Sequence, residues 1–295
     1  MPRGWTISHR LTAALLIFIV LTAAPVFAQM QSESVSGNQP ATSLAVAPYG
    51  RWEITLDGRI GLPNGYLRVG ETPQRGTRLL LNRDLGIDVS EALEAGVAFH
   101  LTDRDALRVR YLYEFLDGDA RFGQTLSYNG DGFGPGRVHT NADFSRVSLD
   151  YERVLMNAYN IFLTGTVGLT YVYFNPTLSQ HGHSNSEDFY LQELPVPIAG
   201  ARVDVPLDPK ASVRLEVSGG GLPRVASGRT EGGTVYLRQI NADAGLSLAY
   251  NVTRALQIDV GYHYSYFLQH ETSHEDDNAF LLRESGFRAR VMFRF

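Results

Sequence analysis

The chain has 295 residues, of which 44% are hydrophobic and 11% aromatic. A formal net charge of −5 argues against nucleic acid as a partner, because the phosphate backbone attracts basic proteins. The sequence holds no cysteine, which excludes disulfides and a lipid anchor on an amino-terminal cysteine.

The first 28 residues have the pattern of a secretory signal peptide. Arg3 and Arg10 precede an apolar run over residues 11–26, and Ala28 is a small residue at a suitable cleavage site. A retained inner-membrane anchor is the alternative, but the run is short for a span of about 20 residues. We therefore predict that residues 1–28 are a signal peptide that is cleaved after Ala28.

Residues 29–50 are rich in Ser, Gln, Ala and Gly without hydrophobic periodicity, and we expect a flexible lead-in. From residue 51 onward, short segments alternate apolar and polar side chains, and no stretch is apolar enough for a transmembrane helix. This alternation predicts β-strands with one apolar face. The strands are expected within residues 51–62, 93–101, 107–115, 138–153, 159–173, 189–205, 213–217, 235–250, 256–266 and 280–295.

The region after the first of these strands decides the strand count. Pro63-Asn64-Gly65 is a hairpin signal, which places a short return strand at 66–71 and another strand at 77–83. This interpretation gives about twelve strands, whereas a different pairing of the region would give ten. Both counts are even, so the two ends of the chain lie on the same side.

Connections between the predicted strands alternate in length. Short turns are predicted at 102–105, 155–158, 206–210 and 251–254, and long loops at 117–137, 175–188, 219–233 and 271–278. Tyrosines recur near strand ends, as at Tyr111, Tyr171 and Tyr262. Short turns at one end, longer loops at the other and aromatic girdles are typical of transmembrane β-barrels.

The last nine residues, F-R-A-R-V-M-F-R-F, alternate between an apolar and a mainly cationic face and end on Phe295. This stretch resembles the closing strand of Gram-negative outer-membrane β-barrels, where the terminal aromatic residue is the signal read by the barrel-assembly machinery. The resemblance implies an all-β, transmembrane antiparallel up-and-down β-barrel over residues 51–295, with both termini in the periplasm. It also implies outer-membrane lipid, lipopolysaccharide and the barrel-assembly machinery as partners, and a periplasmic place for residues 29–50.

Residues 77–88 are similar to a stretch of uncharacterised outer-membrane barrel proteins, which brings no activity with it. A secreted soluble β-barrel or sandwich is the alternative architecture. It would expose aromatic side chains on many strands, which is hard to reconcile with solubility.

The face opposite the apolar one points into the lumen if the apolar face meets lipid. Its charges have both signs, which leaves two interpretations: ion pairs that fill a narrow lumen, or a small polar pore whose lining sets selectivity. The lumen radius decides between them. The predicted lumen-lining residues are Glu53, Asp57, Arg59, Arg108, Arg110, Glu114, Asp150, Glu152, Arg202, Asp204, Arg214, Glu216, Asp243, Asp259, His263, Arg288 and Arg290.

The nearest approach to a catalytic motif is His181-Gly182-His183-Ser184-Asn185. It is similar to the His-x-Ser-Asn pattern of outer-membrane phospholipases and lipid A deacylases, in which the histidine and the serine share one face of a strand. Here His183 abuts Ser184, which sends the two side chains to opposite faces of an extended segment. A serine nucleophile needs its base within hydrogen-bond reach, so we predict no catalytic residue here.

Two loops carry residues that could bind a metal ion. His181 and His183 with Glu187 or Asp188 are one set, and the acidic loop at 271–278 could hold a divalent cation between lipopolysaccharide phosphates. Exposed polar loops account for both patterns, so no metal and no cofactor is predicted.

Three functional hypotheses follow. The first is a structural protein or narrow passive pore, and the second is a lipid-modifying hydrolase. The third is a surface binding or adhesion protein that acts through the loops at 117–137 and 175–188. The sequence does not predict an oligomeric state.

Overall fold

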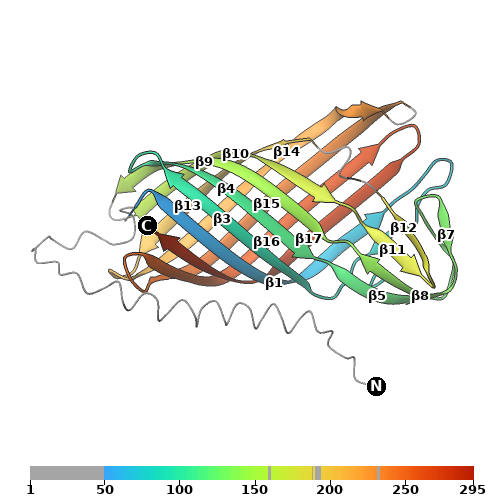
Figure 1. Ribbon diagram of the computed structural model, residues 1–295, viewed down its shortest axis with the longest axis horizontal. Helices are drawn as coiled ribbons and strands as arrows, with labels where there is room; N and C mark the ends of the chain where they lie inside the picture. The colour runs from blue at the N-terminus through green and yellow to red at the C-terminus, as the bar shows by residue number, and fades with distance from the viewer. Residues whose placement is uncertain (1–49, 159–160, 188, 190–193, 231–232) are drawn as a thin grey trace, which may run out of the picture. The chain divides into compact units, whose positions relative to one another are not determined.

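The computed structural model describes residues 50–158, 161–187, 189, 194–230 and 233–295. The predicted signal peptide and nearly all of the predicted lead-in lie outside the described residues. No helix in the described part of the chain is long and apolar enough to span a membrane. The described chain consists mainly of β-strands (Figure 1).

Ten antiparallel strands form one closed barrel. These strands are β1 (Trp52–Arg68), β3 (Ser90–His100), β4 (Asp105–Phe115), β9 (Phe144–Ala158), β10 (Ile161–Phe174), β13 (Val196–Pro206), β14 (Ala211–Thr230), β15 (Thr234–Asn251), β16 (Leu256–Thr272) and β17 (Asp277–Arg294). They neighbour one another in chain order, and β17 closes the barrel by pairing with β1 without a register shift. Closure satisfies the backbone groups that an open edge would leave unpaired.

The predicted antiparallel up-and-down barrel is confirmed, with ten strands rather than twelve. The predicted hairpin at residues 63–65 is wrong, because β1 runs through this motif and stays paired with β17. Trp52 and Phe295 exchange backbone hydrogen bonds. Because N–H groups alternate in direction along a strand, the even-numbered residues of β1 direct theirs to β17 and the odd-numbered residues to β3. The nitrogen of Pro63 therefore faces β3. Pairing with β3 ends at Gly61, so the proline removes no ladder hydrogen bond.

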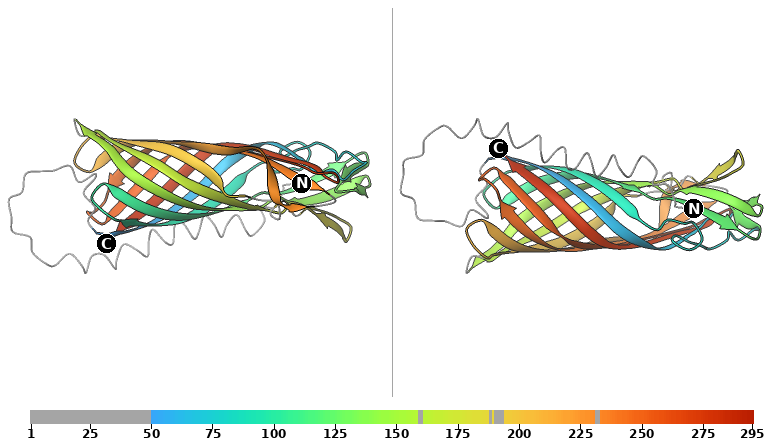
Figure 2. Two further views of the ribbon diagram at one scale, coloured as in Figure 1. Left: turned by 90° about the horizontal axis from the view of Figure 1, so that it is seen from above. Right: turned by 90° about the horizontal axis from the view of Figure 1, so that it is seen from below.

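The two ends of the barrel differ in their connections. Short turns at 101–104, 207–210 and 252–255 lie at the end that carries the carboxy terminus (Figure 2). At the other end, here called the loop end, four further strands form a second sheet beside the hairpin of β6 (Leu126–Tyr128) and β7 (Asp131–Phe133). The four strands are β5 (Asp117–Phe122), β8 (Gly136–Asn141), β11 (Thr177–Gln180) and β12 (His183–Ser186).

Three of the predicted long loops are therefore wrong, and the fourth, at 271–278, is reduced to a turn at 273–276 between β16 and β17. The predicted short turn at 155–158 is also wrong, because these residues belong to β9. Residues 117–137 and 175–188 hold paired strands, and residues 219–230 belong to β14. Gly219 and Gly220 resemble loop residues in the sequence, because glycine has no side chain to pack in a strand. In the barrel both are paired on two sides, with β13 and with β15, and the neighbouring strands hold this segment extended.

The outward face of the barrel is apolar, as the alternation predicts. Ile60, Leu62, Val260 and Phe287 are 52%, 68%, 58% and 68% exposed. Apolar side chains of this kind recur on neighbouring strands all around the closed sheet. Soluble proteins seldom expose an apolar surface that continuous, whereas lipid hydrocarbon would cover it.

Candidate functional site in the barrel interior

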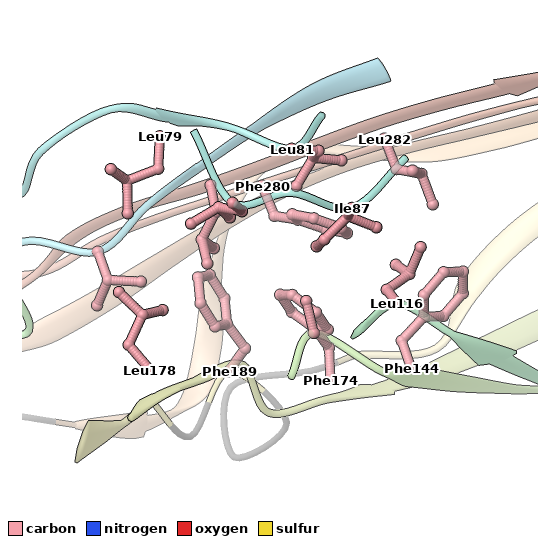
Figure 3. Packing of buried hydrophobic residues seen from close by; sticks show 14 of the residues in the cluster. Leu79, Leu81, Ile87, Leu116, Phe144, Phe174, Leu178, Phe189, Phe280 and Leu282 are labelled. Atoms are coloured by element: carbon pink, nitrogen blue, oxygen red, sulfur yellow. The ribbon is translucent and has the colours of Figure 1, made fainter. Parts of the chain in front are cut away.

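Packed apolar side chains fill the barrel interior at the loop end (Figure 3). Phe174 on β10 stacks on Phe280 of β17 with 4.3 Å between ring centroids, and Phe144 on β9 stacks on Phe267 of β16 at 5.7 Å. In the closed sheet, β10 and β17 are five strands apart in either direction, and so are β9 and β16. Side chains from opposite walls therefore touch across the lumen.

The connection between β1 and β3 completes this apolar core. The short strand β2 (Leu79–Leu80) pairs with the end of β1 that β3 does not reach, so it continues the wall. Leu81, Leu85 and Ile87 follow and are fully buried. Gly86 between them has a φ of 71°, a left-handed conformation that favours glycine. The stretch at 77–88 thus has a packing role.

Ion pairs fill the half of the interior nearer the carboxy terminus. Arg108 on β4 donates to Glu53 Oε1 at 2.7 Å and to Glu152 Oε1 at 2.8 Å, and all three residues are at least nine-tenths buried. Arg214 on β14 lies in the same way between Asp204 and Asp259. Each guanidinium joins acids from two other strands, because its planar fork can donate in two directions.

Other ion pairs cross the lumen. Arg290 on β17 donates two hydrogen bonds to Glu216 on β14, at 2.9 and 2.8 Å, although β15 and β16 separate these strands. Arg146 on β9 contacts Asp243 on β15 at 3.3 Å, and these strands are four apart in the sheet. These contacts leave little width for an aqueous path.

The predicted lumen-lining residues come together in this network. Their pairs are Arg59 with Asp57, Arg108 with Glu53 and Glu152, Arg110 with Asp150, Arg202 with Glu152 and Asp204, Arg214 with Asp204 and Asp259, and Arg288 and Arg290 with Asp57 and Glu216. Sequence reasoning missed Glu94, Arg146, Glu284 and Arg294, which also take part. Strand parity could have found them, because Glu284 and Arg294 share a face with Arg288.

The remaining predicted residues meet partners outside the set. His263 shares a hydrogen bond of 2.9 Å with Glu284, and Glu284 is in turn hydrogen-bonded to Glu114. Asp243 meets Arg146, as described above. These groups lie where the ion-pair network borders the apolar core.

Space for water remains among the charged side chains of the described residues. One cavity, of about 120 Å³, is lined by Arg59, Arg146, Glu216 and Asp243 among others. The second, of about 70 Å³, lies beside His100. Both are polar and have room for a few water molecules.

The residues of the His-rich motif do not form a catalytic pair. His183 contacts Asp131 at 3.2 Å, whereas the Ser184 hydroxyl accepts from Ser179 at 3.1 Å. Within the described ranges, no three His, Asp or Glu side chains are grouped closely enough to hold a metal ion. Asp188 of the proposed metal set lies outside the described residues.

One tyrosine at the loop end has a shifted acidity. Tyr128 on β6 donates to the carbonyl oxygen of Pro176 at 2.7 Å and is fully buried. Burial raises its pKa well above the usual range, and the negative charge of Glu187 adds to the effect. The phenol therefore stays protonated and serves as a structural donor that ties the hairpin to the second sheet.

The described chain forms a closed antiparallel sheet with an apolar outer face and a paired, charged interior. The fold is that of an outer-membrane β-barrel. No protein-family model and no curated protein matches the sequence. Among solved structures, the chain is similar to the outer membrane protease OmpT from Escherichia coli, with 11% identity, a TM-score of 0.48, and coverage of 87% of this chain and 100% of that chain.

Two further solved structures are similar. The translocator domain of the autotransporter NalP from Neisseria meningitidis has 16% identity and a TM-score of 0.43, over 83% of this chain and 88% of that chain. The attachment invasion locus protein Ail of Yersinia pestis has 11% identity and a TM-score of 0.26, over 80% and 97%. Similarity at this level carries no information on activity or substrate.

Proposed function

We propose that the protein is an integral outer-membrane β-barrel whose lumen is closed and whose role is structural, rather than that of a passive pore. In this proposal residues 1–28 are the signal peptide and the apolar outer face meets lipid hydrocarbon. Exposed tyrosines near the loop-end limits of their strands, such as Tyr173 on β10 and Tyr236 on β15, form the aromatic girdle.

The proposed orientation places both termini in the periplasm and the loop end outside. The large connections from β1 to β3, from β4 to β9 and from β10 to β13 lie at the loop end, opposite the end with the short turns, and this asymmetry supports the orientation. Phe295 is 51% exposed beside Trp52, a position in which the barrel-assembly machinery can reach its side chain. Outer-membrane lipid and lipopolysaccharide are the surrounding partners in this proposal.

The stacking of Phe174 on Phe280 carries the proposal of a closed lumen. These rings come from opposite walls, and the surrounding side chains of the apolar core are nearly inaccessible to water. The ion pair of Arg146 with Asp243 forms a second barrier nearer the carboxy terminus. An ion would have to cross an apolar layer and then displace paired charges, and both steps are costly.

Planar-bilayer recording tests the closed lumen. We expect the refolded chain to insert without stable conductance steps. Correct folding can be checked by gel electrophoresis, because a folded barrel migrates differently in unboiled and boiled samples. Reproducible steps whose ion selectivity changes in Arg146→Ala would contradict the proposal, because they would place this side chain along an open path.

A surface binding protein is the second candidate. Hydrogen bonds that tie the connections at the loop end to one another favour it. Asn185 donates to Asp131 at 2.6 Å and Asn129 donates to Asn185 at 3.1 Å, so the hairpin β6–β7 is tied to β12. Preorganised connections lose less conformational entropy when they bind a partner. Cells that display the wild-type chain should then adhere to cultured epithelial cells, and replacement of residues 124–135 by a Gly-Ser linker should abolish adhesion. Equal adhesion of both cell types would remove this candidate.

A further inference from the structure

Three arginines stand on the outer wall of the barrel, toward the loop end. Arg224 on β14, Arg238 on β15 and Arg283 on β17 are all exposed, and we call them the outer arginine patch. Arg238 and Arg283 share strand parity with the exposed Leu246 and Phe287. A register shift between residues 222 and 225 turns Arg224 to the same side. The patch therefore faces away from the lumen.

The height of the patch is set by its distance along the strands. Arg283 lies twelve residues before Phe295, and Arg238 lies thirteen residues before Asn251, both counted from the end with the short turns. With a rise of about 3.3 Å per residue and a strand tilt of about 40°, both stand about 30 Å above that end. The apolar band of an outer-membrane barrel is about 25 Å tall. The patch thus lies just beyond the hydrocarbon, at the level of lipid headgroups.

Aromatic rings hold two of the guanidinium groups in place. Arg224 lies over the ring of Tyr236 at 4.4 Å from the centroid, and Arg283 lies over Tyr266 at 5.7 Å. A guanidinium that lies over a ring keeps its N–H edges available and loses little freedom when it binds an anion. Such an edge donates two parallel hydrogen bonds to a phosphate group.

One further arginine and one histidine stand on neighbouring strands beside the patch. β14, β15, β16 and β17 lie side by side (Figure 1), and Arg238 pairs in register with His270 of β16. Arg68 lies two strands farther along the same row. The carboxylate of Asp277 contacts both Arg68, at 2.7 Å, and His270, at 3.0 Å, so it offsets the charge of Arg68 and leaves the three patch arginines as the anion-binding groups.

On the opposite wall two aspartates stand at this height, and the exposed Arg121 and Arg137 lie farther out on β5 and β8. Asp117 follows Asp105, the first residue of β4, by twelve positions. Asp88 precedes His100, the last residue of β3, by twelve positions. Both are therefore equally far from the end with the short turns. Both aspartates are exposed. The chain carries a net charge of −5, yet one wall gathers arginines. A protein with a net negative charge repels anions as a whole, so any attraction of anions to this wall must come from its local arginines.

We propose that the outer arginine patch binds the phosphate groups of lipopolysaccharide in the outer leaflet. The proposal rests on the proposed membrane location and orientation, and it assigns one wall of the barrel as the lipid-specific face. The apolar belt below the patch contacts the acyl chains of the same lipid, so a phosphorylated glycolipid fits better than a free phosphate ion.

Binding of purified lipopolysaccharide to the refolded full chain in detergent tests the site. We expect the double reversal Arg238→Glu/Arg283→Glu to weaken binding by at least about tenfold, because each arginine near a charged lipid surface contributes several-fold to affinity. The matched control Arg121→Glu/Arg137→Glu changes the same charge on the loop-end sheet and should alter affinity less than about twofold. Lipopolysaccharide stripped of its phosphates should bind wild type and both variants alike.

Each outcome bears on the proposal. Equal binding of wild type and the patch variant, or equal loss in the control, would overturn it. The variant Arg238→Lys/Arg283→Lys separates charge from geometry, since it should recover only part of the affinity because lysine keeps the charge but lacks the bidentate edge. Competition by inorganic phosphate alone would point to a free-anion site instead. Failure of the wild type to insert into phosphatidylcholine vesicles would overturn the membrane location and the patch together, whereas insertion without patch dependence would overturn the patch alone.

Discussion

Replacing Arg108 with methionine is expected to lower the free energy of unfolding by about 3–5 kcal/mol. Arg108 is 7% exposed and lies between Glu53 and Glu152, which are 3% and 8% exposed. Without the guanidinium, two buried carboxylates lose their shared partner and keep only the longer contacts to Arg294 and Arg202, at 3.1 and 3.6 Å. Denaturant unfolding of the refolded chain in lipid vesicles measures the loss.

Arg153→Met is the matched control for this substitution. Arg153 is 56% exposed and contacts Asp105 at 3.4 Å, so water screens the pair and its removal should have a far smaller effect. An Arg108→Met protein as stable as Arg153→Met would show that the buried network does not stabilise the barrel.

Replacing Phe280 with alanine should cost about 3–5 kcal/mol of unfolding free energy. Its ring is fully buried, stacks on Phe174 at 4.3 Å and lies 5.9 Å from the ring of Phe267. Truncation leaves a cavity where the opposite walls now meet, and the closed sheet can contract little to fill it. The same unfolding measurement applies.

Phe287→Ala on the same strand separates the core from the outer face. Phe287 has the opposite parity and is 68% exposed, so its truncation opens no internal cavity. We expect its cost to be a small fraction of that at Phe280. Similar losses at the two positions would mean that the apolar cluster at the loop end is not packed as a core.

Local alternation was enough to assign the faces of the strands. Arg288 and Arg290 share a face opposite Phe287 because successive side chains of a strand point to opposite sides, a rule that needs no tertiary information. The same rule predicts that Ile60 and Val260 lie on the outer face, and both are exposed there. It could not separate turn from strand at residues 63–65, where the outcome depends on which neighbour the proline nitrogen faces.

Alternation in the sequence was sufficient to predict an antiparallel barrel with an apolar outside and a charged inside. The number of strands that close the barrel and the identity of the charges that meet depend on tertiary contacts. Arg146 and Asp243 are 97 positions apart, and Phe174 meets Phe280 from the opposite wall. Contacts across a lumen depend on strand number and register, which set the barrel diameter. The side-chain period of two is local and carries no information on that diameter, so it could not tell an open pore from a closed one.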